Sequence, residues 1–172
     1  MKVAKELLGK TLVRKIGNIK LSGIIIETEA YRGKNDPASH ASRKKTERNK
    51  VMFEQVGVSY VYFTYGMYYC FNIVAKRETD NAGAVLIRSI KPVLGIKHMI
   101  KNRKTDKISN LVNGPGKLSQ ALEITLEQYN QDVTKQTELY VTEGIKPKKI
   151  TSSPRIGISS GTDKMWNFSI KC

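Results

Sequence analysis

The sequence predicts an α+β fold built as a single domain. The chain has 172 residues, a length that suits one domain with its own hydrophobic core. No internal repeat or low-complexity linker divides it, so residues 1–172 are expected to form one unit. Strand-like segments dominate both ends and helical periodicity is confined to the middle, which is not the regular alternation of a parallel βαβ fold. We therefore expect a curved, mostly antiparallel sheet flanked by helices.

Segments rich in β-branched and aromatic residues predict the strands. After a short helix at residues 4–9, the expected strands cover 11–16, 22–31, 58–64, 68–76, 83–90, 138–142, 154–159 and 166–171. The tripeptide Tyr65-Gly66-Met67 separates two of these strands, which predicts a protruding β-hairpin with this tripeptide at its tip.

Helical spacing appears in two later segments. Pro92 suits the first turn of a helix, and apolar residues recur after it at helical spacing as far as residue 103. A second helix is predicted to begin at Asn113-Gly114-Pro115, with Leu118 in its apolar stripe. The segment 33–50 is polar and basic, so it is predicted to be a long loop, and loops of this length in compact domains are often functional.

The charge balance predicts a polyanionic partner. Thirty Lys and Arg oppose fifteen Asp and Glu, which gives a net charge of +15 and a pI of about 9.8. Each phosphate that a basic side chain neutralises releases counterions, so such a chain is suited to nucleic acid. The alternative is an organism that simply favours lysine. Against it, basic residues gather in three short segments, 43–50, 101–107 and 146–149.

Several classes of protein are not favoured by the sequence. No stretch approaches the ~18–20 apolar residues that span a bilayer, and the first residues lack the apolar segment of a secretory signal. The two cysteines, Cys70 and Cys172, are not grouped with histidines at metal-ligand spacing. We therefore expect a cytoplasmic protein with reduced thiols, with no metal or other cofactor and no membrane association. We also expect a monomer, although no pattern in the sequence bears on the oligomeric state.

Two carboxylates interrupt an otherwise apolar strand. Strand alternation places Ile25, Glu27, Glu29 and Tyr31 on one face. The three isoleucines at 24–26 indicate a central strand, so both carboxylates are expected near the core. Burial of a carboxylate is costly and raises its pKa, and functional sites are where such costs are tolerated. The alternative is that the strand ends at residue 26 and both glutamates are solvated.

Five of the eight tyrosines fall within residues 60–69. Aromatic residues at alternate strand positions ordinarily pack in the core or across strands. Tyr65, however, adjoins Gly66 at the predicted hairpin tip and is expected to be exposed. An exposed aromatic side chain on a basic protein is suited to stacking on a base or inserting into a base step.

These segments carry a family resemblance. In chain order, five motifs resemble the alkyladenine (methylpurine) DNA glycosylases: Glu27-Thr28-Glu29-Ala30-Tyr31 with Asp36 and His40, Tyr60 to Asn72, Gly83 to Arg88, Asn113 to Leu118, and Arg155-Ile156-Gly157. The motifs occur in the family's order, and the similarity as a whole spans residues 7 to about 170. Two departures stand out, because the family often has proline where Glu47 lies and relatives commonly continue beyond Cys172.

The resemblance implies a monofunctional glycosylase of base-excision repair. Such an enzyme flips alkylated or deaminated purines, such as 3-methyladenine, hypoxanthine and ethenoadenine, out of double-stranded DNA and hydrolyses the N-glycosidic bond with water. Glu29 matches the family's general base. Arg88, with the backbone carbonyl of Ile156, matches the groups that hold the attacking water.

The remaining matched residues are implied to bind the base and the DNA. Tyr31, His40 and Tyr62 match the side chains that enclose the extruded base, and Asn72 matches the amide that discriminates against guanine's 2-amino group. Tyr65 matches the wedge that fills the vacated stack. Lys117 lies where the first turn of a helix could meet a phosphate.

Two other readings remain open from the sequence. A non-catalytic RNA-binding module fits the charge and the tyrosines equally well, but it does not require carboxylates on an apolar strand. A formyltransferase-like accessory domain would have a similar general fold, but it leaves Tyr65 unexplained, and fold similarity alone does not transfer function.

Overall fold

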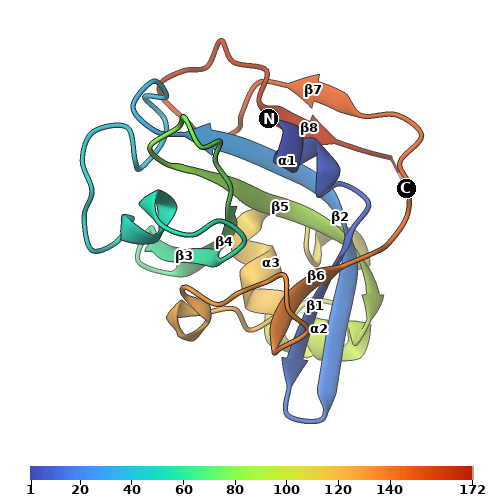
Figure 1. The fold of residues 1–172 in the computed structure, drawn as a ribbon. Coiled ribbons are helices and arrows are strands. Elements are labelled where there is room, and N and C mark those ends of the chain that lie inside the picture. The colour runs from blue at the N-terminus through green and yellow to red at the C-terminus, as the bar shows by residue number, and fades with distance from the viewer. Residues whose placement is uncertain (172) are drawn as a thin grey trace.

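The computed structural model describes residues 1–171 and contains one strongly curled antiparallel sheet (Figure 1). The strand order is β3-β4-β5-β2-β1-β6, with β8 also paired to β2, and β7 to β8. The strands are β1 (Thr11–Ile16), β2 (Ile19–Arg32), β3 (Ser59–Thr64), β4 (Tyr68–Val74), β5 (Gly83–Leu94), β6 (Leu139–Thr142), β7 (Thr151–Ser153) and β8 (Asn167–Ser169). All of these strand pairs are antiparallel. The predicted α+β class is confirmed.

Helices are few and short. The α-helices are α1 (Lys2–Glu6), α2 (Ile96–Arg103) and α3 (Pro115–Ala121), and single 3₁₀ turns occur at Lys50–Phe53, Ile108–Asn110 and Leu126–Gln128. Helices α2 and α3 pack against each other, and α3 also packs on β4 and β5 (Figure 1). Leu118 of α3 is fully buried in the main hydrophobic core, as the predicted apolar stripe requires. No helix within residues 1–171 is long and apolar enough to cross a membrane.

Strand β2 organises the sheet because three strands pair with it. β5 lies along one edge, while β1 pairs with the first half of the other edge and β8 with the second half. The β2–β5 register shifts between Ile25 and Glu27 and again between Glu27 and Thr28. These bulges break the alternation, so Ile25 lies in the core cluster with Ala30. The prediction that Ile25 shares a face with the two glutamates is therefore wrong.

Two predicted elements differ from the structure. β5 continues through Pro92 to Leu94, and α2 begins only at Ile96, after Gly95 with φ +78°. β4 pairs only with residues 84–86 of β5, so the far end of β5 lacks that neighbour and tolerates a proline. The predicted strand 154–159 is also wrong, because β7 ends at Ser153 and the next residues form an irregular segment.

The segment between β2 and the turn at Lys50–Phe53 is a loop, as predicted. Side chains hold it in place of a backbone ladder. Asn49 is buried, its amide nitrogen donates to the carbonyls of His40 and Lys44, and its Oδ1 accepts from the Thr46 N–H at 2.7 Å. These bonds hold the loop in shape, and His40 joins it to the hairpin β3–β4 through Tyr60 and Tyr62.

Candidate active site

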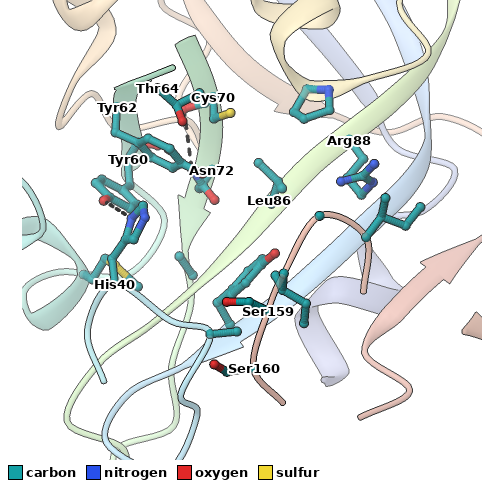
Figure 2. A pocket seen from close by; sticks show the side chains of 18 of the residues that line it. His40, Tyr60, Tyr62, Thr64, Cys70, Asn72, Leu86, Arg88, Ser159 and Ser160 are labelled. Atoms are coloured by element: carbon teal, nitrogen blue, oxygen red, sulfur yellow. Dashed lines mark hydrogen bonds between the residues drawn. The ribbon is translucent and has the colours of Figure 1, made fainter. Parts of the chain in front are cut away.

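A cavity of about 430 Å³ lies where the loop, the hairpin, β5 and the segment after β7 meet. Figure 2 shows side chains from these separate elements turned into the same space. The predicted site residues that line it are Tyr31, His40, Tyr62, Tyr65, Asn72, Arg88 and Ile156. Glu29 and Lys117 are the predicted residues outside this lining. Residues far apart in sequence therefore converge on one cavity.

The Glu29 carboxylate is fully buried and contacts three residues that line the cavity. Its Oε1 accepts from the Ile156 backbone N–H at 2.8 Å and lies 3.5 Å from Arg88 Nε. Its Oε2 accepts from the Tyr31 hydroxyl at 2.8 Å. The alternative of a solvated Glu29 is wrong. Because Oε2 has one protein donor, it keeps a lone pair for a further partner.

Glu27 shares its donors with Glu29. Arg88 Nε lies 3.0 Å from Glu27 Oε1, and Asn167 Nδ2 donates to Glu27 at 2.8 Å and to Glu29 at 3.1 Å. A buried carboxylate is tolerated when it is paired and hydrogen-bonded in this way. Ile156 enters the cluster through its N–H, and the predicted contact of its carbonyl with a water stays a prediction.

Aromatic side chains form one wall of the cavity. The His40 ring meets Tyr62 edge-on at 4.6 Å between centroids, and His40 Nδ1 hydrogen-bonds the Tyr60 hydroxyl at 2.8 Å (Figure 2). Partial desolvation of the ring, with the Arg48 charge as a second cause, lowers the pKa of His40 to about 4. His40 is therefore neutral at neutral pH. Burial raises the pKa of Tyr31 and of Tyr62 well above the usual range, so both hydroxyls remain protonated.

Asn72 is held in a fixed orientation by the hairpin register. It lies opposite Tyr60 in the β3–β4 pair, and its Nδ2 donates to the Tyr60 carbonyl at 2.9 Å. The residue is 3% exposed and lines the cavity. A side chain fixed in this way presents a constant surface to whatever occupies the cavity.

Tyr65 lies at the tip of a tight type I′ turn. Tyr65 has φ +52° and Gly66 has φ +67°, and the Met67 N–H donates to the Thr64 carbonyl at 3.2 Å. Tyr65 is 82% exposed, which confirms its predicted exposure, and it also lines the cavity. The side chain therefore stands largely in solvent at the mouth of the cavity.

Lys117 lies in the first turn of α3, two residues after Pro115, which lines the cavity. Its ammonium group donates to the side-chain oxygens of Asn110 and Asn113. An ammonium group has three N–H donors, so one remains for another acceptor. Lys117 is thus held beside the cavity and not within it.

Comparison with known proteins identifies the family. The sequence matches the family described as Methylpurine-DNA glycosylase (MPG) over residues 1–172. The chain belongs to the methylpurine-DNA glycosylase family. It is an enzyme that hydrolyses N-glycosyl bonds in DNA and acts in base-excision repair. A non-catalytic RNA-binding module and an accessory domain do not account for this membership.

Relatives of the glycosylase are similar along nearly the whole chain. A protein of Prosthecochloris aestuarii is 54% identical over 167 residues, which are 95% of this chain and 79% of the relative. Proteins of Methanocella arvoryzae and Carboxydothermus hydrogenoformans are both 46% identical, over 98% of this chain and 86% and 88% of their own lengths. All three carry the name "Putative 3-methyladenine DNA glycosylase".

Sequence reasoning placed Glu27 near the core with Glu29 but missed Asn167 as a residue of the glycosylase site. Asn167 gave no signal in the sequence because its partners lie in β2, far away along the chain. Glu47, the departure from the family's proline, is exposed and pairs with Lys50 at 2.8 Å.

Within residues 1–171 no three His, Cys, Asp or Glu converge as a metal site requires. The expected lack of a cofactor stays a prediction.

Proposed function

We propose that the glycosylase is monofunctional and removes alkylated and deaminated purines from double-stranded DNA. The class of substrates comprises 3-methyladenine, hypoxanthine and ethenoadenine. One observation supports this above the others: a fully buried carboxylate, Glu29, hydrogen-bonded by residues that line an aromatic cavity. The enzyme acts as a monomer on one lesion at a time.

Access to the bond requires the damaged nucleotide to leave the base stack. A glycosylase cannot reach its target atom inside a duplex, and extrusion costs a few kcal/mol, least for damaged or mispaired bases. The exposed ring of Tyr65 on its rigid turn fills the vacated space. Lys117 donates its remaining N–H to a backbone phosphate beside the cavity.

The cavity then selects the base. Ring alkylation makes a purine cationic, and stacking against Tyr31 and Tyr62 gains a cation–π energy of roughly 0.5–2 kcal/mol. The neutral His40 completes the enclosure, and because it carries no charge it does not repel a cationic base. Asn72, fixed by the Tyr60 carbonyl, excludes guanine through its 2-amino group.

The chemical step is hydrolysis at C1′ of the sugar. Arg88 and the Ile156 carbonyl hold a water, and Glu29 takes its proton as the water oxygen bonds to C1′. The C1′–N bond breaks and its electron pair leaves with the purine, so a cationic alkylated purine departs neutral, whereas a neutral purine such as hypoxanthine departs as an anion that takes a proton from solvent. Among residues 1–171, no lysine lines the cavity, which supports attack by water over a Schiff-base route.

Replacing Glu29 by Gln tests the proposal. Gln preserves shape and can still accept from Ile156 and Asn167, but it cannot take up the proton. Single-turnover release of ethenoadenine or hypoxanthine from a duplex oligonucleotide is expected to fall roughly 10²–10⁴-fold, the usual contribution of a general base. Binding to a duplex with an abasic-site analogue is expected to persist.

Glu143→Gln is the matched control, because Glu143 is exposed, pairs with Lys10 and lies outside the cavity lining. It is expected to release both bases at the parent rate. An undiminished rate in Glu29→Gln would show that this carboxylate is not the base. If the parent protein releases neither purine, the proposed substrate range is wrong.

A further inference from the structure

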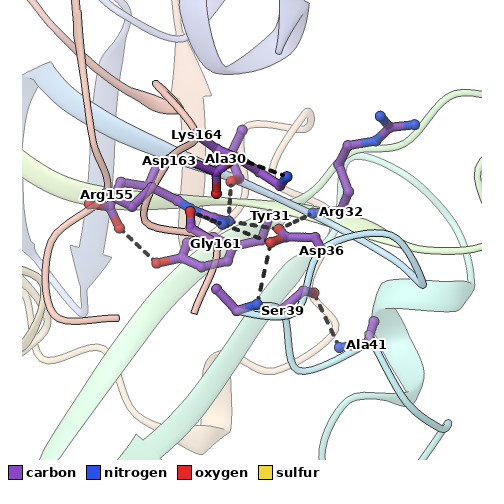
Figure 3. A network of polar contacts seen from close by, with 12 residues as sticks. Ala30, Tyr31, Arg32, Asp36, Ser39, Ala41, Arg155, Gly161, Asp163 and Lys164 are labelled. Atoms are coloured by element: carbon purple, nitrogen blue, oxygen red, sulfur yellow. Dashed lines mark hydrogen bonds and ion pairs between the residues drawn. The ribbon is translucent and has the colours of Figure 1, made fainter. Parts of the chain in front are cut away.

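A fully buried ion pair joins the two segments that flank the cavity. Asp36 belongs to the loop after β2, and Arg155 belongs to the irregular segment after β7. Both side chains are 0% exposed, and the guanidinium donates two parallel hydrogen bonds of 2.7 Å to the carboxylate. Figure 3 shows this pair at the centre of a polar network.

The pair is connected to Glu29 from several directions. The Arg155 guanidinium stacks over the Tyr31 ring at 4.7 Å from its centroid, and Tyr31 in turn donates to Glu29. Arg155 Nη1 also donates to the carbonyl of Ala30, the residue that follows Glu29, at 3.0 Å. The residue after Arg155 is Ile156, whose N–H donates to Glu29.

The same pair anchors the loop that carries His40. Asp36 Oδ2 accepts from the Arg32 N–H at 3.0 Å, and the Asp36 carbonyl accepts from the Ser39 N–H at 2.9 Å (Figure 3). One ion pair therefore fixes residues on both sides of the cavity. A shift of Arg155 would move the Ile156 N–H, the Tyr31 ring and the loop together.

Stability alone is a weak reason for such a pair. A buried ion pair can often be replaced by apolar residues of similar volume without loss of stability, because the desolvation cost offsets the attraction. Apolar residues, however, do not supply two directional hydrogen bonds. Beyond packing, the pair therefore fixes the orientation of the two segments that it joins.

We propose that Asp36 and Arg155 are positioning residues that hold Tyr31 and the Ile156 N–H against Glu29, so that the carboxylate is aligned for the chemical step. This inference rests on the proposed role of Glu29 as the base. The pair does not touch the substrate, so it governs the rate of base release and not the affinity for DNA.

The test is the apolar double variant Asp36→Leu/Arg155→Met, with urea unfolding used to choose conditions in which it is folded. Single-turnover release of ethenoadenine from a duplex oligonucleotide is expected to fall roughly 10²-fold, as small misplacements in an active site do. The Kd for a duplex with an abasic-site analogue is expected to stay near the parent value. A folded variant that releases the base at the parent rate would overturn the proposal, because apolar packing alone would then be enough to align Glu29.

Arg155→Lys is the second variant, in case the apolar pair does not fold. It keeps a buried cation beside Asp36 but loses the parallel hydrogen bonds, and the same fall in rate without a change in Kd is expected. Arg77→Met is the matched control, because Arg77 makes an equivalent two-bond contact with Asp80 on the surface. Its rate is expected to equal that of the parent.

Glu29→Gln, measured in parallel, separates the two proposals. If Glu29→Gln loses activity while both pair variants keep the parent rate, only the positioning role fails. If Glu29→Gln keeps its activity, the role of Glu29 as the base fails, and the positioning role fails with it.

Discussion

At the scale of single residues, two side chains carry costs that folding by itself does not require. Tyr65 occupies the left-handed region, which costs an L-residue other than glycine about 1–2 kcal/mol. Glu29 is a carboxylate with no exposed surface. Costs of this kind persist where the surrounding structure imposes them, and they cluster at functional sites. The proposed mechanism uses both residues.

Tyr65→Asn is expected to stabilise the fold and impair the enzyme. Asn adopts the left-handed region more readily than Tyr, so the free energy of unfolding in urea is expected to rise by about 1 kcal/mol. Release of a paired lesion is expected to slow, because nothing fills the vacated stack, whereas a lesion already unstacked in a bulge is released at the parent rate. Met67→Asn, a change at an exposed residue of the same hairpin, is the control for stability. Equal rates of Tyr65→Asn and parent on the paired lesion would exclude the wedge.

At the scale of elements, the loop between β2 and β3 depends on side chains for its shape. It contains no strand before Ser59, so its backbone polar groups are paired by residues such as Asp36 and Asn49. Asn49 alone ties together His40, Lys44 and Thr46. The Asn49 amide therefore fixes the backbone of His40, while the Tyr60 hydroxyl binds its ring.

Asn49→Ala is expected to loosen this loop while the sheet stays intact. The change removes the hydrogen-bond partners of three partly buried backbone groups, and the 1–3 kcal/mol per group that full burial would cost is roughly an upper bound. Amide hydrogen exchange is expected to accelerate at residues 40–46 and to remain slow in β2 and β5. Asn35→Ala, at an exposed position of the same loop, is the control and is expected to leave amide exchange unchanged both in residues 40–46 and in the sheet. Unchanged exchange at residues 40–46 would show that another contact holds the loop.

At the scale of the whole molecule, the net charge of +15 predicts binding that depends on salt. Some Lys and Arg side chains form ion pairs with surface carboxylates. Because basic residues outnumber acidic ones, others remain able to contact DNA phosphates. Each phosphate contact contributes a slope of about 0.9 to the fall of log affinity with log salt. The total slope therefore counts the contacts that the enzyme makes with the DNA backbone.

Lys117→Gln is expected to reduce that slope by about 1 and to weaken binding on all DNA sequences alike. Its measurement is the Kd for an abasic-site analogue duplex across a series of salt concentrations. Lys20→Gln is the control, because Lys20 lies exposed by the β1–β2 turn at the far end of the sheet (Figure 1). A slope that remains the same in Lys117→Gln would remove Lys117 from the phosphate contacts.

The sequence by itself determined the features that depend on local pattern. The apolar run in β2 predicted a central strand, and Tyr65-Gly66 predicted the hairpin tip because few residues other than glycine tolerate a positive φ there. The ordered motifs identified the family, and with it the residues that the structure gathers around one cavity.

Only the tertiary structure decided the features that depend on partners far away in the chain. The bulges of β2 changed the face of Ile25, and the lack of a β4 neighbour allowed Pro92 in a strand. Asp36 meets Arg155 across 119 residues, and Glu29 meets Asn167 across 138. A buried polar group must be hydrogen-bonded, and its partner can come from any part of the chain that the fold brings close. A local sequence pattern does not show which distant residue that partner is.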